Sequence, residues 1–387
     1  MTTTINNEHK KLNVPNLRFP EFQGEWKRTI FKNVITLQRG SSPRPIIEYV
    51  TTSDDGVNWI KIGDMPHFGR IVTSTEEKIT KEGAKKSRQV NKGDLILSNS
   101  MSYGLPYIMG IDGYIHDGWF VLKNFENTFD KDYLCNLLIS SAIQNQYKRL
   151  AAGGVVQNIS SDLVNSVSVS IPTMMEQKKI SSLLNLIDER IATQNKIIED
   201  LKKLKSAISH ILFSSKGAIH LSEIANVVMG QSPSSNAYND QGLGMPLVQG
   251  NLDISNGKTT PRLYTAEFNQ MTEKGNIILT VRAPVGEVAK ATQKVCLGRG
   301  VCAIIPHEEN MSDFIYQYLT FYKFMWRRYE QGSTFTSING SDVRNIFCPK
   351  VRNVSILTLL DIKINIEERV VKQYQSQKQY MLYQMFI

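Results

Sequence analysis

The sequence contains no long hydrophobic run and no apolar segment at its start. No stretch of 18 apolar residues occurs among its 387 residues, so no membrane-spanning helix is expected. Residues 1–10 read MTTTINNEHK and lack the apolar core of a secretory signal. The hydrophobic content of 41% is still enough for ordinary buried cores, and the length predicts two or three domains. We therefore expect a cytoplasmic protein of more than one domain.

Cysteine is scarce, and the sequence positions of the four cysteines exclude the common metal motifs. Cys135, Cys296, Cys302 and Cys348 form no Cys-x-x-Cys pair, and no histidine lies at zinc-finger spacing from them. Such a pattern is typical of reduced, partly buried thiols in a cytoplasmic protein.

The motifs of nucleotide-dependent and methyl-transferring enzymes are also missing. The sequence has no Gly-x-x-x-x-Gly-Lys-Ser/Thr loop for ATP phosphates. It has no Asn/Asp-Pro-Pro-aromatic tetrapeptide of the kind that amino-methyltransferases use to hold a flipped base. Residues 298–303, GRGVCA, resemble a dinucleotide fingerprint but open a strand-like run, so no helix N-terminus would face a pyrophosphate.

Acidic and histidine residues offer only weak candidates for catalysis. Asp64, Glu76 and Lys78 could be grouped as a metal-nuclease site, because carboxylates and a lysine can hold a metal and activate water. Their surroundings are more typical of a solvated loop. His67 and His116 have no neighbouring nucleophile and are interpreted as structural. We therefore predict no catalytic residue, no metal site and no cofactor in this chain.

What the sequence does contain is a heptad pattern that occurs twice, 173 residues apart. Apolar residues alternate steps of four and three, which predicts a coiled-coil seam, and Lys205 within the seam matches Lys378. We expect two long helices, one ending each half of the chain, that pair as an antiparallel rod between two globular parts. The predicted seam residues are Ile180, Leu184, Ile187, Ile191, Ile198, Leu201, Ile208, Leu212, Leu360, Ile364, Val371, Tyr374, Met381 and Met385.

The duplication continues upstream of both helices. The matching segments are 34–43 with 225–233, 59–64 with 247–251, 92–98 with 274–280, and 153–159 with 332–338. Apolar runs bounded by turn residues predict strands at 94–97, 119–122, 276–280 and 301–305, and helical spacing predicts helices over 133–150 and 313–329. The expected fold class is α+β: two similar domains separated by an antiparallel coiled coil of two long helices, with a pseudo-twofold internal repeat.

The chain is basic, and polar residues gather at the turns of the repeat. A net charge of +9 suits a polyanionic partner, because neutralised phosphates release condensed counterions. Arg, Lys, Asn and Gln are also the side chains that pair with base edges. We predict a DNA-binding role for Arg39, Ser41, Arg44, Lys61, Asn99, Ser100, Tyr103, Gln157, Asn158, Gln231, Ser232, Gln249, Asn251, Arg282, Arg299, Thr334, Ser337 and Asn339.

Several segments together resemble the specificity subunit of type I restriction–modification systems, over essentially the whole chain. Residues 14–26, VPNLRFPEFQGEW, are similar to the N-terminal lead-in of that family. Residues 230–233, 92–94 and 274–276 resemble its recurrent loops, and residues 172–180 resemble the entry into its first spacer helix. The corresponding start of the second helix, residues 349–354, lacks the Glu-Gln of that pattern.

The resemblance implies an architecture and a set of partners. Its expected parts are a lead-in at 1–25, a target-recognition domain at 26–171, a spacer helix at 172–215, a second recognition domain at 216–348 and a second spacer helix at 349–387. Each domain would read one half-site of a bipartite double-stranded DNA target, and the helices would set the spacer and dock two modification (methyltransferase) subunits. Restriction (translocase and nuclease) subunits would join that core. S-adenosylmethionine, ATP and magnesium would then be bound by these partners.

Two alternatives from other classes remain open at the level of sequence. A coiled-coil scaffold with protein-binding heads would explain the duplication and the helices, but it leaves the excess positive charge without a role. A stand-alone nuclease would require the weak acidic group around Asp64.

Overall fold

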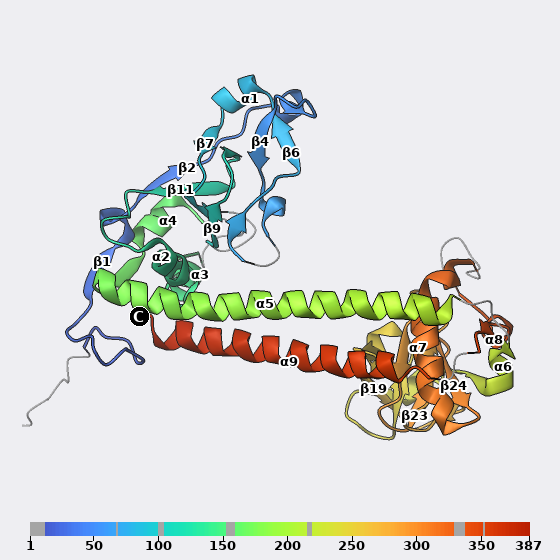
Figure 1. Cartoon of the computed structure of the whole chain (residues 1–387). Coiled ribbons are helices and arrows are strands. Elements are labelled where there is room, and N and C mark those ends of the chain that lie inside the picture. Colours follow the sequence, from blue (N-terminus) through green and yellow to red (C-terminus); the bar gives the residue numbers. More distant parts are fainter. Residues whose placement is uncertain are drawn as a thin grey trace, which may run out of the picture. The chain divides into compact units, whose positions relative to one another are not determined.

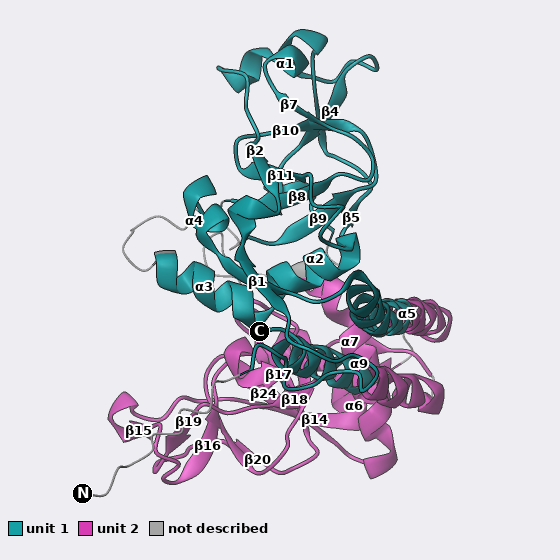
Figure 2. Ribbon diagram, turned by 90° about the vertical axis from the view of Figure 1, so that its left-hand side faces the viewer, with its two compact units in different colours: residues 1–196, 369–387 teal, residues 197–368 magenta. Residues whose placement is uncertain are grey.

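The chain divides into two compact units. The computed structural model describes residues 12–66, 69–99, 104–151, 159–214, 219–328, 337–350 and 353–387. Unit 1 comprises residues 1–196 and 369–387, and unit 2 comprises residues 197–368 (Figure 2). Both divisions fall inside long helices, α5 (Met174–Phe213) and α9 (Ser355–Gln384), so each unit contains a part of both helices.

The described residues of unit 1 form two five-stranded sheets and a two-stranded ribbon. Its strands are β1 (Lys27–Ile30), β2 (Thr36–Arg39), β3 (Val50–Thr51), β4 (Val57–Ile60), β5 (Ile71–Val72), β6 (Glu77–Ile79), β7 (Arg88–Val90), β8 (Leu95–Ser98), β9 (Pro106–Met109), β10 (Gly113–Ile115), β11 (Trp119–Lys123) and β12 (Ser168–Ile171). The sheet orders are β2-β11-β8-β9-β5 and β3-β6-β4-β10-β7, and β1 pairs with β12. Strand pairs β5–β9 and β4–β10 are parallel.

Unit 2 repeats this strand order and adds β17 at the edge of one sheet. Its strands are β13 (Ile219–His220), β14 (Ala225–Met229), β15 (Tyr238–Asn239), β16 (Met245–Val248), β17 (Ile254–Ser255), β18 (Lys258–Thr259), β19 (Leu263–Thr265), β20 (Met271–Thr272), β21 (Ile277–Thr280), β22 (Val288–Lys290), β23 (Val295–Leu297), β24 (Val301–Pro306) and β25 (Phe347–Cys348). The orders are β14-β24-β21-β22-β18-β17 and β15-β19-β16-β23-β20, and β13 pairs with β25. The parallel pairs β18–β22 and β16–β23 also recur at matching places, which confirms the predicted internal repeat.

The remaining elements are short helices around the sheets. They are α1 (Lys81–Lys85), α2 (Lys131–Ile139), α3 (Ser141–Ala151), α4 (Ser161–Ser166), α6 (Leu221–Ile224), α7 (Ser312–Tyr322) and α8 (Gly340–Arg344). The 3-10 turns are η1 (Phe31–Asn33), η2 (Ile46–Glu48), η3 (Ile62–Asp64), η4 (Ser235–Ala237), η5 (Asn251–Asp253), η6 (Glu309–Met311) and η7 (Lys323–Arg328).

The predicted strands are present, but the prediction of one helix over 133–150 was wrong. The backbone breaks at Ser140, which is extended at φ −66° and ψ 154°. The buried Ser140 hydroxyl donates to the Leu137 carbonyl at 2.6 Å, and the Ser140 carbonyl accepts from the Gln144 N–H at 2.9 Å, so a second helix starts there. Similarly, the helix predicted over 313–329 ends as α7 at Tyr322 and continues as the 3-10 turn η7.

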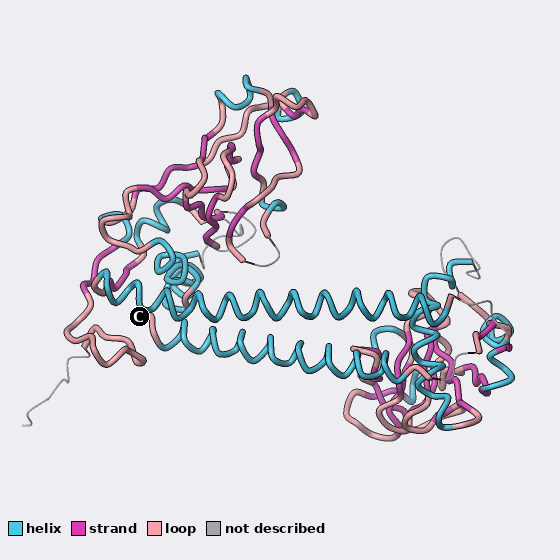
Figure 3. Tube along the Cα trace, in the orientation of Figure 1, coloured by secondary structure: helices cyan, strands magenta, loops and turns pink. Residues whose placement is uncertain are grey.

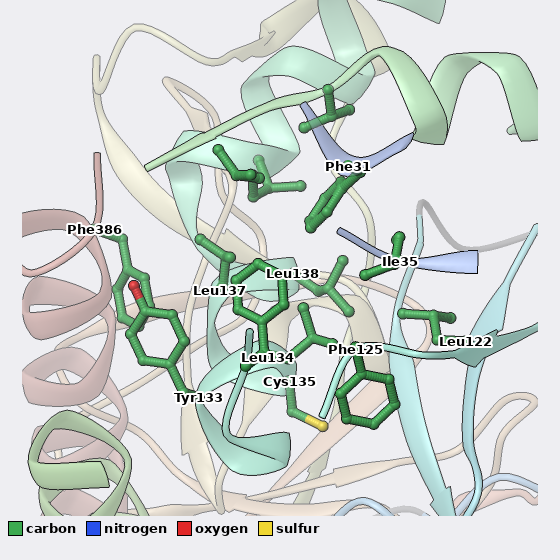
Figure 4. Close-up of a cluster of buried hydrophobic side chains, with 14 of the residues drawn as sticks. Phe31, Ile35, Leu122, Phe125, Tyr133, Leu134, Cys135, Leu137, Leu138 and Phe386 are labelled. Atoms are coloured by element: carbon green, nitrogen blue, oxygen red, sulfur yellow. The ribbon is translucent and has the colours of Figure 1, made fainter. Parts of the chain in front are cut away.

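The core of unit 1 forms on both faces of the sheet that contains β8 and β11. Leu95 and Leu97 face a large cluster with α2, whereas Ile96 packs into a separate cluster, as the two-residue period of a strand requires. Figure 4 shows α2 side chains such as Leu134 and Leu138 among Phe31, Phe125 and Leu122. Unit 2 has an equivalent core in which Ile277 and Leu279 pack with α7 residues.

Within each unit the parts of α5 and α9 run antiparallel. In unit 1, Asp188 and Arg190 contact Lys378 and Tyr374, so residue numbers rise along α5 as they fall along α9. In unit 2, Lys202 and Lys205 contact Glu368 and Asp361 in the same sense. Figures 1 and 3 show both helices as unbroken helical runs.

Candidate nucleic-acid interface

A cavity of about 160 Å³ opens in unit 2 where several strands of the two sheets end. The loops that follow β14, β16 and β21, together with the turn between β23 and β24, meet at this edge. These loops bring together Ser232, Gln249, Arg282 and Arg299, which were predicted from four separate parts of the sequence. The complete lining is Ser232, Gln249, Gly250, Arg282, Ala283, Arg299 and Gly300.

Glycines allow the backbone of this cavity to pack closely. A Cβ at Gly230 would lie 2.1 Å from the Gly298 carbonyl oxygen, and a Cβ at Gly300 would lie 2.1 Å from the Gln249 carbonyl oxygen. Only glycine fits at such distances. The glycines of the GRG sequence therefore form a tight turn between β23 and β24, and the Arg299 N–H donates to Ser232 Oγ at 3.1 Å.

The cavity is positively charged. The side chains of Arg282 and Arg299 are exposed, and no carboxylate in the described part of the chain forms an ion pair with either of them. The Gln249 backbone is held in place because its N–H donates to the buried Asp253 carboxylate at 2.8 Å. Two guanidinium groups, an amide and a hydroxyl on neighbouring loops can donate hydrogen bonds to base edges or to phosphate oxygens.

The other predicted residues of unit 2 lie around this edge. Gln231 is exposed and follows Gly230, and Asn251 begins η5. Ser337 forms an isolated β-bridge with Arg282. Asn339 caps α8, since its side chain accepts from the Asp342 N–H at 3.0 Å. Thr334 lies outside the described residues.

In unit 1, several predicted residues surround Asp117, which was not predicted. Asn99 Nδ2 and Arg39 Nε donate to the Asp117 carbonyl at 2.8 and 3.4 Å, and Arg44 pairs with the Asp117 carboxylate at 3.3 Å. Asn99 is only 4% exposed, so in this conformation it holds the turn. Ser41 Oγ donates to the Lys86 carbonyl at 3.1 Å.

The Asp117 carboxyl is stabilised in its ionised form. Burial raises its pKa, but hydrogen bonds from Ser42, from its own backbone and from Arg44, together with the charge of His116, outweigh this and lower the pKa below its usual value. A sequence signal for Asp117 existed: at the offset of 182 that relates 92–98 to 274–280, Asp117 aligns with Arg299.

Of the remaining predicted residues of unit 1, only Lys61 lies within the described part of the chain. Lys61 forms an ion pair with Glu77 at 2.7 Å. Ser100, Tyr103, Gln157 and Asn158 lie outside the described residues, as does His67.

The predicted seam residues are all buried or half-buried. Buried positions are Ile180, Leu184, Ile187, Ile198, Ile364, Val371 and Met385, and half-buried positions are Ile191, Leu201, Ile208, Leu212, Leu360, Tyr374 and Met381. Polar pairs interrupt this apolar contact at equivalent places in the two units. Lys378 contacts Asp188 in unit 1, and Lys205 contacts Asp361 at 2.6 Å in unit 2, with both lysines and both aspartates related by 173 residues.

A buried carboxylate joins the lead-in to α5 in unit 1. Glu176 is 1% exposed and accepts from Arg18 at 2.8 and 2.9 Å and from Trp26 Nε1 at 3.2 Å. The hydrogen bond to Glu176 is the main cause of the raised pKa of Arg18. The lead-in at residues 14–26 and the spacer-helix entry at residues 172–180 therefore contact one another.

The described residues contain no group of three or more His, Cys, Asp or Glu side chains placed to hold a metal ion. All four cysteines are free and buried, as expected. Burial raises the pKa of Cys135 to about 11 and those of Cys302 and Cys348 to about 12, so these thiols stay protonated at neutral pH. In the part of the chain that is described, no helix has the length and apolar character needed to span a bilayer.

Comparison with known families identifies the class of protein. The family model for the type I restriction modification DNA specificity domain matches residues 24–203 and again residues 217–373. Because these two matches cover most of the chain, the protein belongs to that family. It is a DNA-recognition subunit of the type I restriction–modification specificity class, a class that is itself non-catalytic, and neither alternative function receives support.

Individual relatives agree with this assignment. The MjaX specificity subunit of Methanocaldococcus jannaschii is 27% identical over 379 residues, covering 88% of this chain and 86% of the relative. The MjaVIII specificity subunit of the same organism is 26% identical over 54% of this chain and 50% of its own.

Two solved structures show the same fold. The S subunit of a type I restriction–modification system from M. genitalium has a TM-score of 0.59 and 18% identity, covering 97% of this chain and 99% of that one. A chain from a structure that describes complex assembly and conformational transition of a type I R-M system has a TM-score of 0.62 and 21% identity, with 92% and 96% coverage.

Proposed function

We propose that each half of this chain reads one half-site of a bipartite double-stranded DNA target. The paired helices set the length of the unspecified spacer and dock two modification subunits, and restriction subunits join the resulting core. The chain itself supplies recognition, and adenine methylation and ATP-dependent cleavage take place on the partners.

The observation that carries this proposal is the matching of the two units. The sheets repeat in order, and the polar turns recur at the same strand ends in both copies. Two similar binding edges on one chain suit a ligand that also has two similar, separated parts, as half-sites on duplex DNA are. The positive cavity of unit 2 adds a surface of the correct charge for DNA.

Exposed apolar side chains on the long helices support the docking of partner helices. Water-exposed apolar patches on a protein mark sites of interaction. On α5 these side chains are Leu186, Ile197, Leu204 and Ile211, and on α9 they are Ile356, Leu359, Ile362 and Ile366. Leu183 of α5 is half-buried against the unit 1 core and does not belong to this exposed set.

The assignment of catalysis to partners follows from the chemistry that the sequence lacks. The sequence has neither a phosphate-binding loop for ATP nor the amino-methyltransferase tetrapeptide for a flipped adenine. S-adenosylmethionine, ATP and magnesium are accordingly proposed for the modification and restriction subunits.

An exchange of one recognition domain tests the proposal. Residues 26–171 are replaced by the equivalent segment of another family member, and the complete complex is expressed in cells whose methylated sites are then sequenced. We expect one half-site to change while the other half-site and the spacer length stay as they were. The reciprocal exchange of residues 216–348 serves as the matched control and should alter the other half-site. Alteration of both half-sites by a single exchange would contradict separate reading by the two halves.

A further inference from the structure

Asp117 and Arg299 occupy the same position of the repeated fold. The Asp117 N–H donates to Ser42 Oγ at 3.3 Å, and the Arg299 N–H donates to Ser232 Oγ at 3.1 Å. The backbone of each residue therefore makes the same contact, to the serine of a Gly-x-Ser-Pro loop.

The neighbouring backbone contacts also match. A Cβ at Gly40 would lie 2.0 Å from the carbonyl oxygen of His116, as one at Gly230 would lie 2.1 Å from that of Gly298. The glycine that follows in each turn, Gly118 or Gly300, accepts an N–H from the end of the adjacent strand at 2.9 Å. The turn before β11 and the turn before β24 therefore make the same set of backbone contacts.

The two side chains at this shared position carry opposite charges. Arg299 is exposed at the cavity of unit 2 beside Arg282 and Gln249. Asp117 has a side chain that is 43% exposed, and its carboxylate accepts from Ser42 at 3.0 Å and Arg44 at 3.3 Å. A carboxylate offers about four acceptor sites, so the hydrogen bonds from Ser42, Arg44 and its own backbone leave capacity for one further donor.

The reversal of charge favours a base contact over a phosphate contact. Phosphates carry the same charge in every half-site, so a residue that binds phosphate would keep a positive charge in both copies. Base edges differ between half-sites. Guanine presents the O6 and N7 acceptors that pair with arginine, and cytosine presents an N4 amino donor that pairs with a carboxylate.

We propose that this turn position is a specificity-determining position in both halves, at which Arg299 donates to guanine and Asp117 accepts from the amino group of cytosine. Each half-site then contains a G·C pair at this position, read from the guanine side by unit 2 and from the cytosine side by unit 1. This inference rests on the proposed bipartite recognition of DNA and adds the identity of one base pair in each half-site.

Two neutralising variants test the inference in the complete complex with its modification subunits. The methylated motif of the wild type is determined first by sequencing, and Arg299→Gln and Asp117→Asn are then compared with it. We expect Arg299→Gln to relax one G·C position of one half-site. The preference for G·C over other base pairs at that position should fall from about 10–100-fold to only a few-fold. Asp117→Asn should relax one position in the other half-site. The spacer and all other positions should stay unchanged.

Matched controls remove the same charges elsewhere in each unit. Lys294, which pairs with Glu273, lies at the opposite end of β23 from Arg299, so Lys294→Gln should leave the motif as in the wild type. Asp55, which is exposed and lies near Lys81, is the corresponding control for Asp117 as Asp55→Asn. Arg299→Lys keeps a donor for guanine and should retain the guanine preference, so it tests the inference even if the glutamine variant does not fold.

The outcomes separate the inference from the proposed function. A wild-type complex that methylates no bipartite motif would overturn the proposed function itself. A bipartite wild-type motif that Arg299→Gln leaves intact, with methylation reduced evenly over all sites, would mean a phosphate contact and would overturn the inference alone. Relaxation of both half-sites by one variant, or an Arg299→Lys protein that no longer prefers guanine, would also overturn it.

Discussion

At the scale of single residues, the contacts separate side chains that hold the fold from side chains that face solvent. Asn99 and Asn339 were both predicted to bind DNA, yet Asn99 bonds to the Asp117 carbonyl and Asn339 caps α8. Arg282 and Arg299 have exposed side chains at the cavity of unit 2, as binding requires. Similarly, Glu176 is buried with Arg18 and Trp26, so it joins the lead-in to α5.

Arg282 provides a prediction at this scale. If its guanidinium contacts a phosphate, Arg282→Gln should lower the slope of log binding constant against log salt by about one unit, because one fewer counterion is released. The measurement is DNA binding by the complex over a range of salt concentrations. Lys294→Gln, which removes a charge from the start of β23 in the other sheet of unit 2, should leave the slope unchanged. An unchanged slope for Arg282→Gln would instead assign Arg282 to the fold, through its bridge with Ser337.

At the scale of elements, the long helices combine an apolar seam with ion pairs that define its register. A shift of either helix by one heptad would separate Lys205 from Asp361 in unit 2 and Lys378 from Asp188 in unit 1. Leucine and isoleucine tolerate such shifts better, because one apolar contact replaces another. The polar pairs therefore specify the alignment, as a buried polar residue does in other coiled coils.

The pair in unit 2 can be tested by unfolding measurements. Lys205→Met should lower the free energy of unfolding by about 1–3 kcal/mol, because it leaves the half-buried Asp361 carboxylate without its cation. Adding Asp361→Asn should recover much of this loss, since the amide is neutral and its oxygen still accepts from Gln317. The exposed Lys203, paired with Glu199 one turn away, is the control, and Lys203→Met should leave the free energy of unfolding nearly unchanged because solvent screens an exposed pair. Equal losses for Lys205→Met and Lys203→Met would argue against a role in alignment.

At the scale of the whole molecule, the proposed spacer function predicts the effect of lengthening the helices. Seven residues add about 10 Å to a helix, close to the length of three base pairs. A heptad inserted near Ile198 in α5, with a matching heptad in α9, should lengthen the DNA spacer and preserve both half-sites. Sequencing of methylated sites reports all three features of the motif together. A constant spacer in a stable, active complex with the insertion would exclude the helices as its determinant.

Several features followed from the sequence because they depend on local or periodic patterns. The heptad spacing predicted α5 and α9, and apolar runs after Lys-Gly turns predicted β8 and β21. The break at Ser140 was missed because helical apolar spacing continues through it, and the hydrogen bonds of the extended Ser140 are visible only in the structure. The DNA-binding roles of the predicted polar residues stay predictions.

The amino-acid sequence by itself determined the duplication, the paired helices and the absence of enzyme motifs, since each of these is a property of residue order. Tertiary structure alone decided which polar residues share a cavity and which hold a turn. Arg282 and Arg299 come together through loops at one sheet edge, and Asp117 gains its neighbours from β2 and β8. Such groupings depend on strand order and close glycine packing, and residues far apart in the chain meet only after the sheets have formed.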